Sequence, residues 1–227
     1  MKGALKIVNH ANKTKPLRSK MGGPVLCLLS VFLLLCLLVS PAAAEVEWKV
    51  SPSNPAVGDM LKIKGTASPG ESIGAEVSFE KEVPVCGGRY EYLLEDIKIP
   101  DGSNNRFTVT ADGVQNLHVG VKKFACFNRC SDASGGSATI SQAHVPPLTY
   151  DEILIDGDAV CGMSSVNLRF TTSQVLTADS KGKFEYRYDT SSMPAGEFSI
   201  KIGGSEETVE LRSKEEKLKE EKSKSVS

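Results

Sequence analysis

The sequence predicts an all-β protein with two tandem Ig-like β-sandwich domains, preceded by an N-terminal signal peptide and followed by a charged C-terminal tail. Three observations support this fold class. Short runs of residues alternate between apolar and polar side chains, the two halves of the chain resemble each other, and a long apolar segment lies near the N-terminus.

The first 44 residues have the parts of a secretory signal peptide. The opening 20 residues carry six basic residues and no acid, and an apolar run follows from Pro24 to Val39. Small residues at Ala42 and Ala44 form an A-x-A site, which predicts cleavage after Ala44. The alternative is an uncleaved anchor, since the run reaches the roughly 20 residues of a membrane-spanning helix only with its small flanking residues. Membrane attachment is therefore expected only if this segment is retained.

Period-two alternation predicts many half-buried strands. In "MLKIKG" (60–65), Leu61 and Ile63 share one face while Lys62 and Lys64 share the other. Comparable runs are "AEVSF", "RYEYLL", "RFTVTA", "NLHVGV", "EILIDG", "VNLRFTT", "KFEYRY" and "FSIKIG". Glycine, proline, asparagine and aspartate separate these runs, as is typical of the short strands of a β-sandwich.

The two halves align along most of their length. "NPAVGDMLKIKGTA" (54–67) matches "PPLTYDEILIDGDA" (146–159). The difference between the numbers of aligned residues changes only where turns are expected. The aligned pairs include Ile63 with Ile155, Gly65 with Gly157, Phe79 with Phe170, Tyr92 with Tyr186, and Phe107 with Phe198. This order of matches predicts a duplicated module.

The repeat sets the predicted boundaries. They are a signal peptide at 1–44, a first Ig-like module at 45–122, an inter-module linker at 123–136, a second Ig-like module at 137–212, and a charged helical or disordered tail at 213–227. The aromatic residues fall in strand phase and are predicted to pack in the cores or as cross-strand pairs.

The stretches "GDMLKIKGTASPG", "GRYEYLLEDIKIPDGSNNRFTVTADGVQNLHVGVK" and "SDASGGSATISQAHVPPLTYDEILIDGDA" resemble secreted or cell-surface proteins of methanogenic archaea that carry repeated Ig-like modules. The resemblance covers nearly all of 45–211, and its motifs mark strands and turns. It implies an exported, non-enzymatic envelope protein with a structural or protein-interaction role, and a cell-envelope or surface-layer protein as partner. The alternative is a carbohydrate- or calcium-binding β-sandwich module.

The charge balance argues against nucleic acid as a partner. The chain has 27 basic and 28 acidic residues, and removal of the six basic residues before Ala44 leaves 21 against 28, a net charge of −7. Nucleic-acid binding depends on lysine and arginine contacts with phosphates, which an acidic chain supplies poorly.

Four cysteines follow the signal peptide: Cys86, Cys126, Cys130 and Cys161. An even number in an exported chain predicts disulfides. Cys126 and Cys130 are closest in sequence and predict a short clip within the linker. The alternatives are a pair between Cys161 and one linker cysteine, and free thiols, which the reducing habitats of methanogens favour.

No metal, cofactor or catalytic site is predicted. Cys126, Cys130 and His144 fall short of the four ligands of a structural zinc site. "IDGDA" (155–159) and "ADSKG" (178–182) carry too few acids for a calcium loop and are predicted to be surface turns. No hydrolase or nucleotide-binding motif is present, and His118 lies in a strand-like run, where it is predicted to be a packed or surface residue.

The processing prediction is tested by the intact mass of the purified exported protein. We expect the mass of a chain whose first residue is Glu45. The difference in mass between protein alkylated before reduction and protein alkylated after reduction gives the number of disulfides. A mass that retains the first 44 residues would show that the segment is kept as an anchor.

Overall fold

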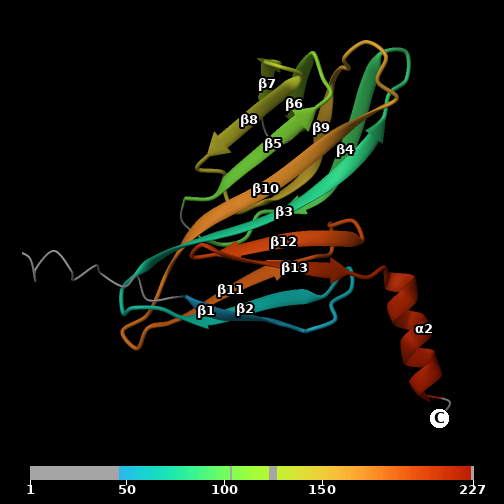
Figure 1. Ribbon diagram of the computed structural model, residues 1–227. Coiled ribbons are helices and arrows are strands. Elements are labelled where there is room, and N and C mark those ends of the chain that lie inside the picture. Colours follow the sequence, from blue (N-terminus) through green and yellow to red (C-terminus); the bar gives the residue numbers. More distant parts are fainter. Residues whose placement is uncertain (1–45, 103, 123–126, 226–227) are drawn as a thin grey trace, which may run out of the picture. The chain divides into compact units, whose positions relative to one another are not determined.

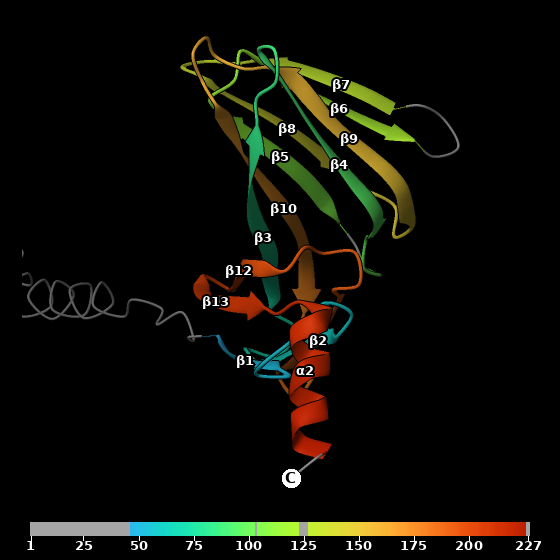
Figure 2. The ribbon, with the colours of Figure 1, turned by 90° about the vertical axis from the view of Figure 1, so that its right-hand side faces the viewer.

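The computed structural model describes residues 46–102, 104–122 and 127–225 (Figures 1 and 2). The predicted signal peptide, its cleavage site at Ala44 and Cys126 of the predicted clip lie outside these residues. The prediction of an all-β protein is confirmed, because antiparallel strands and one charged helix make up the described elements. None of the described helical structure has both the length and the apolar character needed to cross a membrane.

The strands are β1 (Glu47–Ser51), β2 (Met60–Thr66), β3 (Ser72–Pro84), β4 (Arg89–Lys98), β5 (Arg106–Asp112), β6 (Asn116–Lys122), β7 (Phe127–Asp132), β8 (Ser137–Ala143), β9 (Thr149–Asp158), β10 (Ser165–Thr177), β11 (Lys183–Asp189), β12 (Gly196–Ile202) and β13 (Ser205–Leu211). They form three sheets with the orders β1-β2-β11, β13-β12-β3-β10-β5-β8 and β4-β9-β6-β7. The helix α2 spans Lys214–Ser225, within the predicted tail.

The longest ladder joins β3 to β10. These strands pair antiparallel along their whole length, from Ser72 opposite Thr177 to Pro84 opposite Ser165. At the middle of the ladder Phe79 lies opposite Phe170, and the two rings stack with their centroids 4.8 Å apart. Phe170 is buried, and Phe79 packs against both hydrophobic clusters of the described chain.

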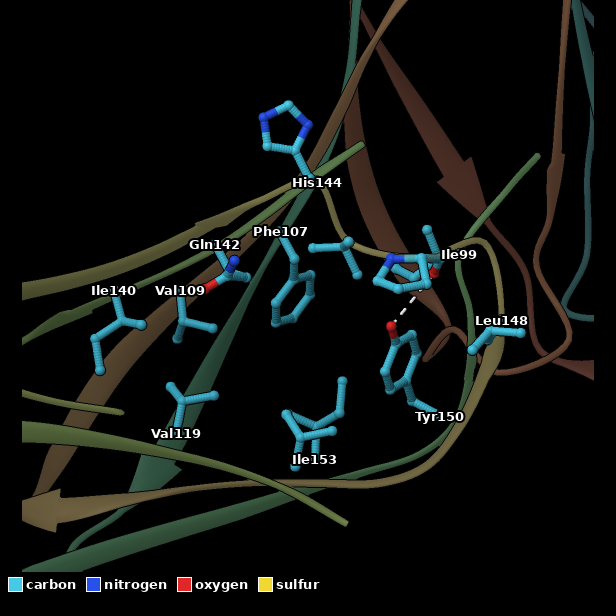
Figure 3. A pocket seen from close by; sticks show the side chains of 13 residues that line it. Ile99, Phe107, Val109, Val119, Ile140, Gln142, His144, Leu148, Tyr150 and Ile153 are labelled. Atoms are coloured by element: carbon cyan, nitrogen blue, oxygen red, sulfur yellow. Dashed lines mark hydrogen bonds between the residues drawn. The ribbon is translucent and has the colours of Figure 1, made fainter. Parts of the chain in front are cut away.

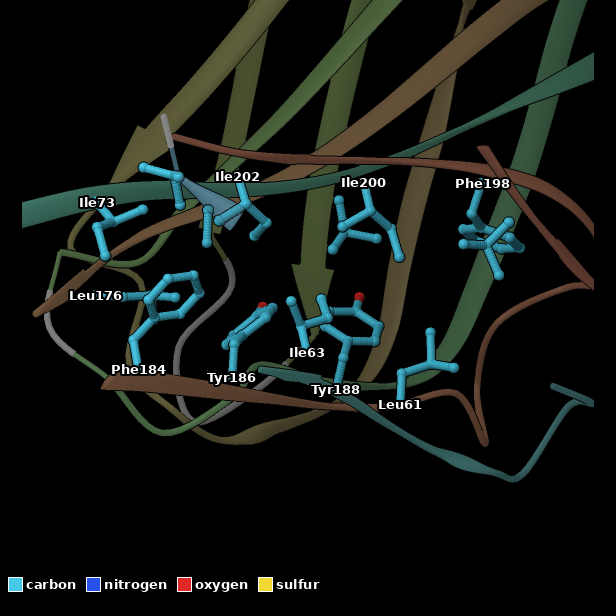
Figure 4. Packing of buried hydrophobic residues seen from close by; sticks show 14 of the residues in the cluster. Leu61, Ile63, Ile73, Leu176, Phe184, Tyr186, Tyr188, Phe198, Ile200 and Ile202 are labelled. Atoms are coloured by element: carbon cyan, nitrogen blue, oxygen red, sulfur yellow. The ribbon is translucent and has the colours of Figure 1, made fainter. Parts of the chain in front are cut away.

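One hydrophobic cluster lies between the β1-β2-β11 sheet and the β12, β13 and β3 strands. Figure 4 shows isoleucines of β12 facing the inward side chains of β2 and β11 across this interface. The facing residues include Ile200 and Ile202 on one side, and Ile63, Tyr186 and Tyr188 on the other. Alternation in β11 explains this placement, since Phe184, Tyr186 and Tyr188 are buried while the residues between them are not.

The other cluster lies between the β4-β9-β6 strands and the β10, β5 and β8 strands, with Val83 at the end of β3. Its largest fully buried side chains include Tyr90, Leu117, Ile155, Leu168 and Phe170. Both clusters therefore have the two-layer packing expected of half-buried strands.

The packing does not follow the predicted modules 45–122 and 137–212. β2 pairs with β11 and β4 pairs with β9, so each pairing joins a strand from one half of the sequence to a strand from the other. The predicted linker 123–136 contains β7, which pairs with β6. The physical reason is that alternation identifies which face of a strand is buried, but it does not identify the strand's partner.

An aromatic residue lies opposite a glycine in both of these pairings between the two halves of the sequence. Gly65 lies opposite Phe184, and Gly157 lies opposite Tyr90. A Cβ atom on Gly65 would come within 2.3 Å of the Phe184 Cζ atom, and one on Gly157 within 2.8 Å of the Tyr90 hydroxyl. The Tyr90 hydroxyl donates a hydrogen bond to the Asn116 carbonyl at 2.9 Å. Both positions require glycine because an aromatic side chain and a backbone carbonyl oxygen, that of Glu47 at Gly65 and that of Asn116 at Gly157, occupy the space of a Cβ atom.

Helix α2 begins with a capping box. The Glu216 carboxylate accepts hydrogen bonds from the backbone N–H and hydroxyl of Ser213, at 2.8 and 2.9 Å, and the Glu216 N–H donates back to the Ser213 hydroxyl. One turn further on, Lys217 donates to the Asp59 carboxylate at 2.5 Å, and the Ala56 N–H donates to the same carboxylate. These two hydrogen bonds lower the pKa of Asp59.

Substitution of Gly65 by alanine is expected to lower the free energy of unfolding by about 1–3 kcal/mol, because the new methyl group overpacks against the Phe184 ring and the Glu47 carbonyl oxygen. Gly74, also in an extended strand, is the matched control, since no heavy atom lies within 4 Å of the place that its Cβ would take. Denaturant unfolding of G65A and G74A tests this. Equal stabilities of the two variants would contradict the packing of Phe184 on Gly65.

The Lys217–Asp59 pair predicts a pH-dependent contribution to stability. Because the folded pKa of Asp59 is lowered, the contribution is present above the unfolded pKa of about 3.9 and is lost as the pH falls through the folded value. Lys217→Met should therefore destabilise the protein at pH 7 by less than about 1 kcal/mol and have no effect at pH 2. Lys219→Met is the control on the same helix. A pH-independent difference would rule out this electrostatic origin.

Candidate functional site

The described part of the chain contains an apolar cavity of about 310 Å³ between the two layers that surround the second cluster (Figure 3). Its walls are almost entirely aliphatic and aromatic. The lining residues are Ile99, Phe107, Val109, Val119, Val121, Ile140, Gln142, His144, Val145, Pro146, Leu148, Tyr150 and Ile153.

Strand alternation directs these side chains into the cavity. Phe107 and Val109 of β5, with Ile140 of β8, form one wall, and Val119 of β6 and Ile153 of β9 lie across the space from them (Figure 3). Elsewhere in this cluster, large side chains such as those of Tyr90 and Leu168 are fully buried. Around the cavity, Phe107 and Ile140 are only half-buried although they belong to inward-facing positions.

The segment between β8 and β9 forms the mouth of the cavity. The Val145 N–H donates to the Asn105 carbonyl at 3.0 Å, and the Tyr150 hydroxyl donates to the Pro146 carbonyl at 3.3 Å. Burial raises the pKa of Tyr150, so the hydroxyl stays protonated at neutral pH. Gln142 adds a side-chain amide to the wall formed by β8, where it lies near Ile140 and Val109 (Figure 3) and donates to the Ala143 carbonyl at 2.8 Å. The site thus joins an apolar interior to a few polar groups at its opening.

His144 does not form a site with Cys130. It has a positive φ of 56°, and its ring points away from the other cavity-lining side chains in Figure 3. Cys130 lies in β7, where its partner across the ladder is His118. The histidine that sequence spacing associated with the cysteines is therefore not the one that strand pairing places beside Cys130.

The outer face of the β4-β9-β6-β7 sheet gathers several of the residues considered from sequence. Register places Cys130 of β7 opposite His118 of β6, and His118 opposite Asp156 of β9. His118 Nδ1 lies 3.3 Å from the Asp156 carboxylate, and Arg89 approaches the same carboxylate at 3.5 Å. Sequence reasoning placed His118 on a strand but gave no sign of these partners, because they depend on strand order.

Cys86, Cys130 and Cys161 are free, exposed thiols. Cys86 lies in the turn between β3 and β4, and Cys161 lies in the turn between β9 and β10. No disulfide joins cysteines within the described residues. The predicted Cys126–Cys130 clip, and any pair of Cys161 with Cys126, include a residue outside that part of the chain.

The two acidic stretches considered for calcium have other partners. Asp156 and Asp158 lie in β9, where Arg89 contacts both carboxylates and Asn116 donates to Asp158 at 2.8 Å. Asp179 accepts the backbone N–H groups of Lys181 and Lys183, as expected of a turn residue. Across the residues that the structure covers, no group of three or more histidine, cysteine, aspartate or glutamate side chains is arranged to hold a metal ion.

No protein-family model, curated protein or solved structure matches this chain.

Proposed function

We propose that this chain is an exported, non-enzymatic binding protein of the cell envelope, and that its apolar cavity holds the aliphatic part of a small amphipathic ligand. The observation that carries the proposal is the unfilled space of about 310 Å³ between two sheets whose facing side chains are apolar. Protein interiors are normally packed to high density, so half-buried apolar side chains around such a space favour a bound apolar group.

The lining defines the class of ligand. The volume lies at the lower end of the range for small-molecule sites, and aliphatic walls suit a short alkyl or isoprenoid chain. Each buried methylene contributes about 0.8 kcal/mol. Gln142 and Tyr150 are polar groups of this lining, and because they already donate to the Ala143 and Pro146 carbonyls, their oxygens would act as acceptors for a polar head.

The envelope location is supported by the signal-like N-terminal segment and by the resemblance to surface proteins of methanogenic archaea. In this proposal the strands hold the ligand site and also give the protein a structural or protein-interaction role, with another envelope protein as partner. The calcium-binding alternative is disfavoured, since Asp156 and Asp158 already pair with Arg89, while the carbohydrate-binding alternative stays a prediction of the sequence.

We also propose that the two halves are copies of one Ig-like module that exchange strands. Equivalent residues in the aligned halves have equivalent partners: Ile63 lies opposite Tyr186, and Ile155 lies opposite Tyr92. The glycine–aromatic pairs repeat in the same way. A duplication with exchanged strands explains why the sequence repeat and the two hydrophobic clusters do not share boundaries.

An environment-sensitive apolar probe, N-phenyl-1-naphthylamine, tests the cavity. The probe should gain fluorescence with the wild-type protein, and decanoate or decanol should displace it. Ile140→Trp fills the cavity from β8 and should reduce probe binding about tenfold or more, because a bulky ring removes the space for the ligand. Thr139→Trp, on the exposed face of the same strand, is the matched control.

Thermal unfolding provides the second measurement. A ligand that binds only the folded state at 100 times its dissociation constant adds about 2.7 kcal/mol to the stability of the wild-type protein. I140W should lose this stabilisation and T139W should keep it. Wild-type protein that binds no probe, or I140W that binds as well as T139W, would contradict the proposal.

A further inference from the structure

Three residues with complementary chemistry form a row across the outer face of the β4-β9-β6-β7 sheet. Cys130, His118 and Asp156 come from the adjacent strands β7, β6 and β9, and each lies directly opposite the next. Directly opposed residues of antiparallel strands have Cβ atoms about 4.5–5.5 Å apart and project from the same face. The row therefore brings a thiol, an imidazole and a carboxylate together in that order.

The carboxylate fixes the orientation of the imidazole. Nδ1 of His118 lies 3.3 Å from Asp156 Oδ1, so in the neutral ring Nδ1 carries the proton and donates it to the carboxylate. Nε2 is then left with its lone pair, and Cys130 lies on the strand at the other side of His118 from Asp156. Arg89, whose side chain is largely exposed, contacts the same Asp156 oxygen at 3.5 Å.

We propose that Cys130 is a site of thiol–disulfide exchange, with His118 as its base and Asp156 as the residue that positions His118. This proposal is independent of ligand binding in the cavity, because the row lies on the opposite face of the sheet. The register places Cys130 across the ladder from His118, and a nucleophile, a neighbouring base and a third group that orients the base are the elements that activate thiols in proteins.

The substrate is a small disulfide, R–S–S–R′. The Cys130 proton passes to His118 Nε2, the Cys130 thiolate attacks one sulfur, and the S–S bond breaks. The leaving thiolate takes the proton from the imidazolium, so the products are the mixed disulfide Cys130–S–S–R and the thiol R′–SH. The disulfide is itself the oxidant, and the sum of bonds, protons and electrons is unchanged.

The same molecule contains two internal controls. Cys86 and Cys161 are exposed free thiols like Cys130, but each lies in a turn rather than across a ladder from a histidine. His118 has a side chain that is 42% exposed, so its replacement by glutamine should leave the fold intact. Differences in rate between the three cysteines then report the local chemistry rather than access alone.

The test is the rate of glutathionylation of each cysteine in the fully reduced protein, followed by site-resolved mass spectrometry with oxidised glutathione. At pH 7, Cys130 should react at least about tenfold faster than Cys86 and Cys161, the scale of modest general-base catalysis. H118Q should bring Cys130 to the rate of the two controls without changing theirs. D156N should lower the Cys130 rate in part, while the melting temperature stays near that of the wild type.

A pH profile separates activation from a structural effect. The charged groups around the pair on this face are Asp156 and Glu91 along the row, and Asp132, Asp158 and Arg89 diagonal to it. Near pH 9 an unassisted thiol is largely ionised, so the difference between wild type and H118Q should shrink. Cys130 that reacts no faster than Cys86 and Cys161, or an H118Q variant with an unchanged Cys130 rate at pH 7, would overturn the proposal.

Discussion

The β3–β10 ladder is the interaction on which the rest of the structure depends. It pairs 13 residues of each strand without interruption, and each strand contributes buried side chains to both hydrophobic clusters. The stacked rings of Phe79 and Phe170 lie at its centre. Because the ladder runs past both clusters, neither half of the sequence can complete a core without strands from the other half.

Much of the local structure could be predicted from the sequence. Alternation identified the inward faces of β2 and β11 through residues such as Ile63 and Tyr186, and the predicted all-β class is confirmed. The partner of each strand could not be predicted in this way. β2 presents the same apolar face whether it pairs within its own half or with β11, so the register and strand order depend on long-range packing.

The same limit applies to the candidate sites. Cys130 was visible as a chemically distinctive residue, but sequence distance pointed to Cys126 and His144 rather than to His118 and Asp156. The cavity could not be predicted from the sequence either, because Val119 and Ile140 follow the same apolar–polar alternation as ordinary core residues. The space becomes apparent only when the two sheets are assembled, because their facing side chains leave a volume of about 310 Å³ unfilled. Both proposals concern the β4-β9-β6-β7 sheet, whose inner face is apolar and lines the cavity and whose outer face bears Cys130, His118 and Asp156.

Exchange of strands between the halves is the central claim of this account, and zero-length carbodiimide cross-linking tests it most directly in the wild-type protein. Lys64 of β2 and Glu185 of β11 form an ion pair at 3.3 Å, and Lys98 of β4 approaches Asp189 of β11 at 3.1 Å. The account predicts that mass spectrometry will find Lys64 joined to Glu185 and Lys98 joined to Asp189. Cross-links of Lys64 and Lys98 confined to partners within residues 45–122 would contradict it.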